Sequence, residues 1–172
     1  MDFEKICKQR FSVRSFSERK PDEKIIEKLC GLARLSPTAK NNQPYELYVI
    51  SGEKSLKKLE NAKACIYGAP VAIVVCSDKE KAWRNRYSGQ DSTLQDVGIV
   101  ATTLLYGAEE YGLNGIYICN FDPQATKTEF SMSENLTPEC IIAVGYKTDD
   151  CVPSERHFER RELKEFVHYE KD

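Results

Sequence analysis

The residues best suited to bind an anion lie near the start of the chain, in the string Arg10-Phe11-Ser12-Val13-Arg14. In an extended segment, side chains at even spacing point to the same side, so Arg10, Ser12 and Arg14 are predicted to share one face. Two guanidiniums and a hydroxyl match the oxygens of a phosphate monoester. Strings of this kind are also common as solvated surface or phosphorylation sites, so both interpretations stay open.

Two other segments combine polar side chains with a position between predicted elements. The loop 36–44 reads SPTAKNNQP and follows a predicted helix, a place where loops commonly hold ligands. It could equally be a plain turn, because Asn and Pro favour turns. The segment 112–122 reads GLNGIYICNFD and predicts a helix end, a turn, a strand and the next helix start. Alone, it indicates only topology.

The cysteines and histidines argue against several other chemistries. The seven cysteines are odd in number and form no Cys-x-x-Cys pair, which suits neither a disulfide framework nor a zinc site. The histidines, His157 and His168, are far apart in a chain that has only 2 of them. We therefore expect neither a metal site nor a Cys-His nucleophile pair.

Composition favours a single soluble domain over residues 1–172. Lys and Arg total 25 against 27 Asp and Glu, so no overall attraction to nucleic acid or to an anionic membrane is expected. The first residues, MDFEKICKQR, contain no apolar run of signal-peptide length, and the apolar stretch 69–76 is too short to span a bilayer. We expect a cytoplasmic protein that binds neither nucleic acid nor membrane.

The elements that must position these segments are read from hydrophobic periodicity. Helices are predicted over 21–35, 53–61, 91–111 and 123–130, and strands over 45–51, 70–76, 116–119 and 140–146. The order lacks a strict βαβ repeat, which favours an α+β fold of at most three layers. The continuous apolar run 70–76 predicts a central strand covered on both faces. Residues 147–172 have too few apolar side chains for a core of their own.

In their order and separation, these segments resemble the FMN-dependent nitroreductase family, in particular its short members. The family string R-R-S-x-R corresponds to 10–14, and the block A-R-x-x-P-S-x-x-N-x-Q-P-W corresponds to 33–45. Further similar segments are 112–122, against G-L-G followed by F-D, and 163–170, against L-x-E-x-V-H-Y-E. The resemblance implies a mixed sheet flanked by helices in an intertwined homodimer. FMN would lie at the interface, and the tail 147–172 would wrap onto the partner.

The resemblance also implies which residues bind FMN. The N-terminal string would contact phosphate, ribityl and pyrimidine edge, and the polar loop of the other subunit would contact the same FMN. Backbone amides after a strand would lie beside flavin N5, and a late arginine would close on the phosphate, with the second of two adjacent arginines as the weaker candidate. The implied residues are Arg10, Ser12, Arg14, Pro37, Thr38, Ala39, Asn41, Gln43, Ile118, Cys119, Asn120, Arg160 and Arg161.

The implied activity is transfer of reducing equivalents from NAD(P)H to an organic acceptor, such as a nitroaromatic or a quinone. Both half-reactions would use one flavin face, which gives ping-pong turnover. In such an enzyme the flavin performs the chemistry while the protein binds, orients and tunes it. No side chain is therefore predicted to be catalytic, and Cys119 is not expected to act as a nucleophile.

Three positions depart from the family pattern. Phe11 stands where the family usually has Arg or His, Asn120 replaces a common glycine near N5, and Tyr45 replaces Trp. The first two keep open the alternative of a flavin-binding protein for storage or sensing with little turnover. A further alternative is a related flavoprotein that acts on another substrate.

Overall fold

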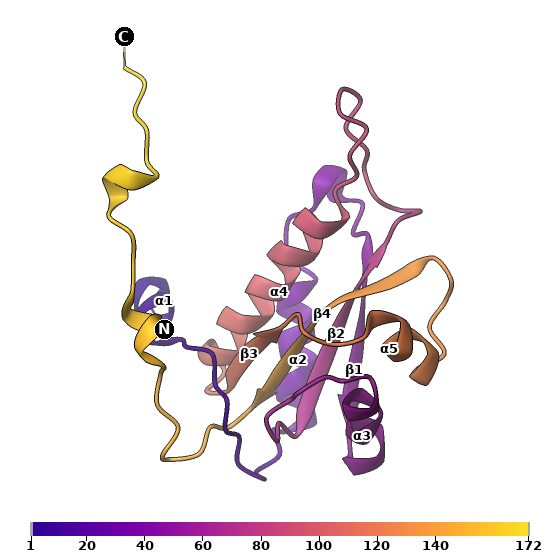
Figure 1. The fold of residues 1–172 in the computed structure, drawn as a ribbon, viewed down its shortest axis with the longest axis vertical. Helices are drawn as coiled ribbons and strands as arrows, with labels where there is room; N and C mark the ends of the chain where they lie inside the picture. Colours follow the sequence, from indigo (N-terminus) through magenta and orange to yellow (C-terminus); the bar gives the residue numbers. More distant parts are fainter. Residues whose placement is uncertain (1, 172) are drawn as a thin grey trace.

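A four-stranded antiparallel sheet organises residues 2–171, the part of the chain that the computed structural model describes (Figure 1). The strands are β1 (Tyr45–Ser51), β2 (Val71–Asp78), β3 (Asn114–Ile118) and β4 (Leu136–Gly145), in the spatial order β1-β2-β4-β3. All residues of β2 are buried, as its continuous apolar run predicted. The sheet is therefore covered on both faces.

Helices α2 (Glu23–Ala33) and α4 (Thr93–Glu110) cover one face of the sheet. Asp22 caps α2, because its side chain accepts a hydrogen bond from the backbone N–H of Lys24 at 2.8 Å. The two helices approach closely at Gly107, where an added Cβ would lie 2.8 Å from Leu29 Cδ1. At 18 residues, α4 is the longest helix in the described part of the chain, and it is packed closely against α2.

The opposite face carries α3 (Glu53–Asn61), α5 (Pro123–Glu129) and the extended segment 11–16. From that segment Phe11, Val13 and Phe16 enter the same apolar cluster as the sheet residues on this side. The result is a three-layer α+β arrangement, which confirms the predicted fold class.

Two elements differ from the sequence prediction. A helix α1 (Phe3–Gln9) was not predicted, because Ile6 is its only buried residue and it provides no apolar stripe. It lies against α4, with the Phe3 ring 5.5 Å from the Tyr106 ring. Strand β4 begins at Leu136 rather than at residue 140, because Pro138 is accommodated where the β2–β4 register shifts, opposite Cys76.

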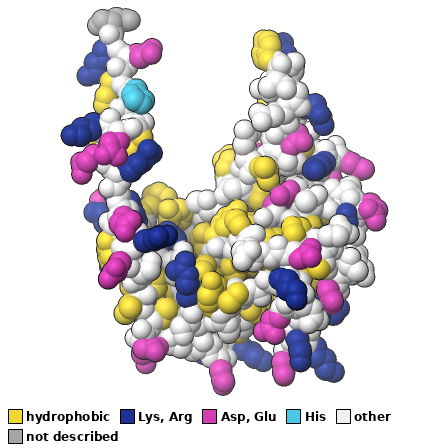
Figure 2. Space-filling view, viewed as in Figure 1, with side chains coloured by type: hydrophobic (Ala, Val, Ile, Leu, Met, Phe, Trp, Pro, Cys, Tyr) yellow, Lys and Arg dark blue, Asp and Glu magenta, His cyan; other side chains and the backbone are white. Residues whose placement is uncertain are grey.

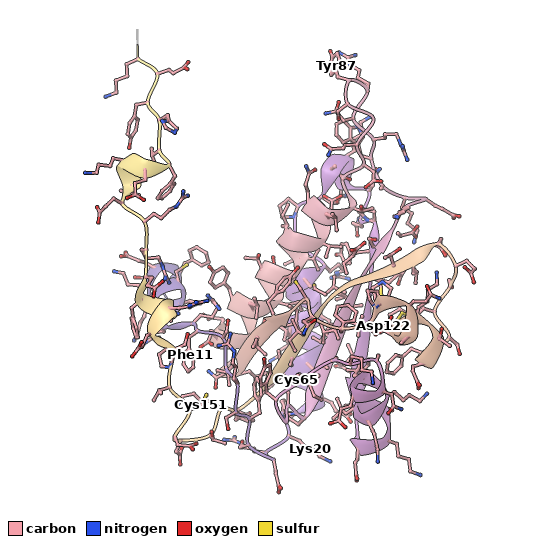
Figure 3. The ribbon with its side chains drawn as sticks, in the orientation of Figure 1. Phe11, Lys20, Cys65, Tyr87, Asp122 and Cys151 are labelled. Carbon is pink, nitrogen blue, oxygen red and sulfur yellow. The ribbon has the colours of Figure 1, made fainter. Side chains whose placement is uncertain are left out.

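Residues 79–92 form a projecting hairpin, the β2–α4 arm (Figure 1). Arg84 and Asp91 pair across it, and the backbone N–H of Asn85 donates to the oxygen of Gln90 at 2.8 Å. Tyr87 lies at the tip with 82% of its surface exposed (Figure 3). The arm is therefore held by its own hydrogen bonds rather than by the core.

The tail after β4 leaves the domain and extends on the same side as the arm (Figures 1 and 2). It contains two short 3-10 turns, η2 (Glu155–Phe158) and η3 (Leu163–Glu165). Its apolar residues Leu163, Phe166 and Tyr169 are exposed. The far end of the tail does not cover the core of its own chain, and its wrapping onto a partner stays a prediction.

Candidate functional site

Residues 10–17 form an extended segment that brings the predicted anion-binding string to the start of the tail. Helix α1 ends at Gln9, and its C-cap residue Arg10 has an extended backbone (φ −61°, ψ 129°). The segment is fixed by the N–H of Val13, which donates to the Gly115 oxygen at 3.3 Å. Because Phe11 and Val13 are buried, alternation places Ser12 and Arg14 on the outer side.

The tail begins by running antiparallel to this segment. Phe16 pairs with Lys147, and the Thr148 hydroxyl lies 2.9 Å from that of Ser15. The turn η2 consequently lies beside Phe11 (Figure 3). Between the two strips of chain lies a cavity of about 200 Å³, which we call the tail pocket. Its lining residues are Phe11, Ser12, Arg14, Ser154, Arg156 and His157.

The structure brings Ser12 and Arg14 together but places Arg10 elsewhere. Arg14 Nη1 donates to the backbone oxygen of Ser12 at 3.3 Å, and both residues line the tail pocket. The Arg10 guanidinium instead lies 5.9 Å from the centre of the Tyr106 ring on α4. Within this chain, Ser12 and Arg14 therefore share one face as predicted, and Arg10 does not join them.

The late arginines, Arg160 and Arg161, are exposed and do not line the tail pocket. Arg160 Nη1 donates to the backbone oxygen of Glu159 at 2.6 Å and also to that of His157. The Arg161 guanidinium lies 5.0 Å from the centre of the Phe166 ring. Their predicted contact with a phosphate stays a prediction.

The polar loop 36–44 is tied to α4 and to the arm. The Ala39 N–H donates to Asp96 Oδ1 at 2.9 Å, and Asp96 Oδ2 accepts from the Ser92 hydroxyl at 2.6 Å. Asn42 Nδ2 donates to the backbone oxygen of Lys81 at 2.9 Å. Asp96 is only 2% exposed, so the loop is anchored to a carboxylate inside the protein.

The same loop has an unusual backbone. Lys40, Asn41 and Gln43 have φ values of 54°, 56° and 51°, in the left-handed region that side chains other than glycine seldom adopt. The Thr38 hydroxyl accepts the N–H of Gln43 at 3.1 Å and so stabilises the conformation. Such strain often occurs at ligand sites, which supports a functional role for the loop.

The two halves of the predicted site lie near opposite ends of α4. Ala39 is attached at Asp96, in the first turns, whereas Arg10 lies over Tyr106, in the last turns. Ten residues separate these attachment points (106 − 96), which corresponds to about 15 Å along a helix. Within one chain, the loop and the N-terminal arginine are therefore held far apart.

The residues predicted to lie near flavin N5 are at the end of β3 and directly after it. Ile118 is the last residue of the strand and is buried, whereas Cys119 and Asn120 are exposed. Next, Asp122 caps α5 by accepting the N–H of Ala125 at 2.9 Å. The neighbouring Cys140 thiol has its pKa raised to about 12, chiefly by burial. The Cys140 thiol is therefore expected to be inert.

Four residues of these sites were not predicted from the sequence. Ser154, Arg156 and His157 reach the tail pocket only because the tail turns back along residues 11–16, which no local spacing reveals. Asp96 does carry a signal, because it precedes Val100 by four residues and so falls on the buried side of the predicted helix. A carboxylate at such a position requires buried donors.

An apolar groove runs along α4, from α1 beside its last turns to Leu94 in its first turn. In Figure 2 the hydrophobic side chains of this region gather between the tail and the arm. The groove, which we call the α4 groove, has a volume of about 840 Å³. Its apolar lining residues are Phe3, Ile6, Leu32, Leu94, Ile99 and Tyr106. A soluble monomer seldom exposes a continuous apolar surface of this kind.

Residues 2–171 contain no helix long and apolar enough to cross a membrane. In the same range, no three His, Cys, Asp or Glu side chains are grouped so that they could hold a metal ion.

Comparison with known proteins identifies the class to which this arrangement belongs. The sequence profile of the nitroreductase family matches residues 7–66 and 57–146, which is most of the chain. The chain belongs to the nitroreductase family. It is similar to a nitroreductase family protein of Clostridium difficile 630, whose crystal structure shares 38% sequence identity and covers 99% of both chains with a TM-score of 0.91.

Two further relatives carry functional names. An NADH dehydrogenase of Thermus thermophilus is 21% identical over 188 residues, covering 91% of this chain and 92% of its own. An FMN-dependent nitroreductase of Clostridium difficile R20291 is 23% identical, with a TM-score of 0.77, and covers 97% of this chain and 98% of its own. At these identities the solved structure supports the shared fold.

Proposed function

We propose that the protein is an FMN-dependent oxidoreductase that takes reducing equivalents from NAD(P)H and passes them to an organic acceptor. One observation carries the proposal: a nitroreductase-family chain holds its polar loop and its N-terminal arginine about 15 Å apart along α4. Two copies packed against each other can bring the loop of one copy to the arginine of the other. FMN would lie at that junction.

The residues present suit such a cofactor. The tail pocket offers guanidinium and hydroxyl donors and has no carboxylate in its lining, which suits a phosphate group. The strained loop offers the hydroxyl of Thr38 and the amide of Asn41, and Asp96 anchors the loop through the Ala39 N–H. When bound, FMN would supply the hydride chemistry of both half-reactions.

The protein's own part is to bind and orient. Arg10, which lies outside the tail pocket, is the cation that would stand near the pyrimidine edge, where positive charge favours reduced flavin. The loop 36–44 of the other subunit would close over the same ring system. The residues 118–120 would present backbone amides near N5. None of these roles requires a side-chain acid or base.

We further propose that a second copy of this chain occupies the α4 groove. The groove and the exposed apolar residues of the tail, among them Leu163 and Phe166, leave apolar surface that a homodimer would bury. The tail and the arm rise on the same side of the domain, one on each side of the groove (Figure 2). A partner seated between them would contact both.

Purification and anaerobic reduction test the proposal. The protein should be yellow, or should become yellow on addition of FMN, and the flavin absorbance should bleach with NADH or NADPH under anaerobic conditions. Sedimentation should give a dimer. A colourless chain that takes up no FMN would contradict the proposal, and a yellow chain that neither nicotinamide reduces would favour a storage or sensing role.

A further inference from the structure

The tail pocket combines polar side chains that are distant in sequence, among them two guanidiniums. Arg14 and Ser12 come from the extended N-terminal segment, and Arg156 and His157 come from turn η2. The lining contains two guanidiniums, one imidazole and two hydroxyls, and none of the lining side chains is acidic. Groups of this kind around a small cavity are suited to an anion that carries several oxygens.

The imidazole of His157 is held in place by aromatic packing. The Phe11 ring is 9% exposed and meets the His157 ring edge-on, with centroids 6.2 Å apart and an interplanar angle of 65°. The Phe158 ring also meets this imidazole edge-on, with centroids 5.1 Å apart and an interplanar angle of 79°. Phe11 thus forms an apolar wall that positions His157 at the pocket.

The turn itself is stabilised by Arg160. Its guanidinium donates to the backbone oxygens of His157 and Glu159, and these hydrogen bonds hold the backbone at the end of η2. Arg160 therefore holds the turn that presents Arg156 and His157, while its own side chain lies outside the pocket lining. This makes it a positioning residue in the present geometry.

We propose that Arg156 and His157 bind the phosphate monoester of FMN, together with Ser12 and Arg14 of the same chain. The inference rests on the proposed function, because it names the tail residues that hold the phosphate of that cofactor. Phe11 supplies no hydrogen bond to an anion, so the donors beside Ser12 come from the tail instead. The tail then serves cofactor binding in addition to any contact with a partner.

Comparison of FMN with riboflavin tests this inference, because riboflavin lacks the phosphate. Both flavins are titrated into the apo form of the full-length protein. A hydrogen bond to a charged group is worth about 1.5–3 kcal/mol, so Arg156→Ala should weaken FMN binding by roughly 10- to 150-fold. Its affinity for riboflavin should stay within about twofold of the unsubstituted protein.

Further variants separate contact from positioning. Arg156→Lys keeps one charge and should recover part of the FMN affinity, and His157→Ala should lose FMN affinity but not riboflavin affinity. Arg160→Ala should weaken FMN binding less than Arg156→Ala. The control is Arg86→Ala, at the exposed tip of the β2–α4 arm, which should bind both flavins like the unsubstituted protein.

The outcomes distinguish this inference from the proposed function. If FMN binds tightly and Arg156→Ala leaves the ratio of FMN to riboflavin affinity unchanged, the tail pocket does not hold the phosphate and the inference is wrong. An unsubstituted protein that binds riboflavin as tightly as FMN would also overturn it, while leaving the flavin function standing. If neither flavin binds, the proposed function itself fails.

Discussion

Asp96 is a buried carboxylate that joins the loop 36–44 to α4, and its removal should both destabilise the fold and loosen the loop. In Asp96→Ala, the Ala39 N–H and the Ser92 hydroxyl lose the acceptors that they contact at 2.9 and 2.6 Å. A buried donor left without a partner costs about 1–3 kcal/mol. Because Ala39 is only half-buried, we expect a loss of about 2–4 kcal/mol in the free energy of unfolding rather than the full sum for two buried donors.

Urea denaturation without flavin measures this loss directly. The midpoint should fall with an unchanged slope, because the unfolded chain exposes the same surface. In thermal unfolding, the expected loss corresponds to a fall in Tm of about 4–16 °C for a chain of this length. FMN affinity should fall as well, because the loop would have to be ordered when the cofactor binds.

Two matched variants locate the effect. In Asp96→Asn, one oxygen still accepts from Ala39 and the amide can donate to Ser92, so the loss should stay below about 1 kcal/mol. Ser92→Ala removes a single bond and should cost about half as much as Asp96→Ala. If Asp96→Ala unfolds at the same urea concentration as the unsubstituted protein, the anchoring role assigned to this carboxylate is refuted.

Two other predictions concern packing and pH. Gly107→Ala places a Cβ 2.8 Å from Leu29 Cδ1 and should lower the free energy of unfolding by about 1–3 kcal/mol. Gly31→Ala in α2 has nothing within 4 Å of the added Cβ and should raise it by roughly 0.5–1 kcal/mol. Equal urea midpoints for the two variants would contradict the close approach at Gly107. Burial raises the pKa of Glu109, although the hydrogen bond from Asn114 opposes this effect. The folded state therefore favours the protonated carboxyl, and the protein loses stability as the pH rises through the pKa of Glu109 in the folded state. Glu109→Gln should therefore stabilise the protein more at pH 7.5 than at pH 4, and a gain that is equal at both pH values would show that burial does not control this group.

Helices and strands with a clear hydrophobic period could be predicted from the sequence. Helix α4 was expected over 91–111 and spans Thr93–Glu110, and β2 was expected to be central because its run is apolar on both sides. Their burial is a repeating property of neighbouring residues, so a local pattern contains it. The start of β4 was missed because its alternation is interrupted by Pro138, whose accommodation depends on β2.

The site was predictable only where its residues are close in sequence. Ser12 and Arg14 share a strand-like segment, and their common side follows from the alternation of that segment. Arg10 departs from it because α1 ends there and turns the side chain toward Tyr106. Arg156 joins the tail pocket through the path of the tail, which is set by pairing between Phe16 and Lys147. Such a contact depends on tertiary structure alone.

The β2–α4 arm makes the chain permissive to insertion at one place. Its order comes from pairs such as Arg84 with Asp91, so a longer segment at Gly89 would leave the sheet and both apolar clusters intact. Doubling the length of a flexible loop adds only about 0.6 kcal/mol of closure entropy. The base of the arm is bonded to the strained loop through Lys81 and Asn42, so a segment grafted at the tip would be carried on an arm that is attached to that loop. New selectivity could therefore be engineered here without redesigning the scaffold.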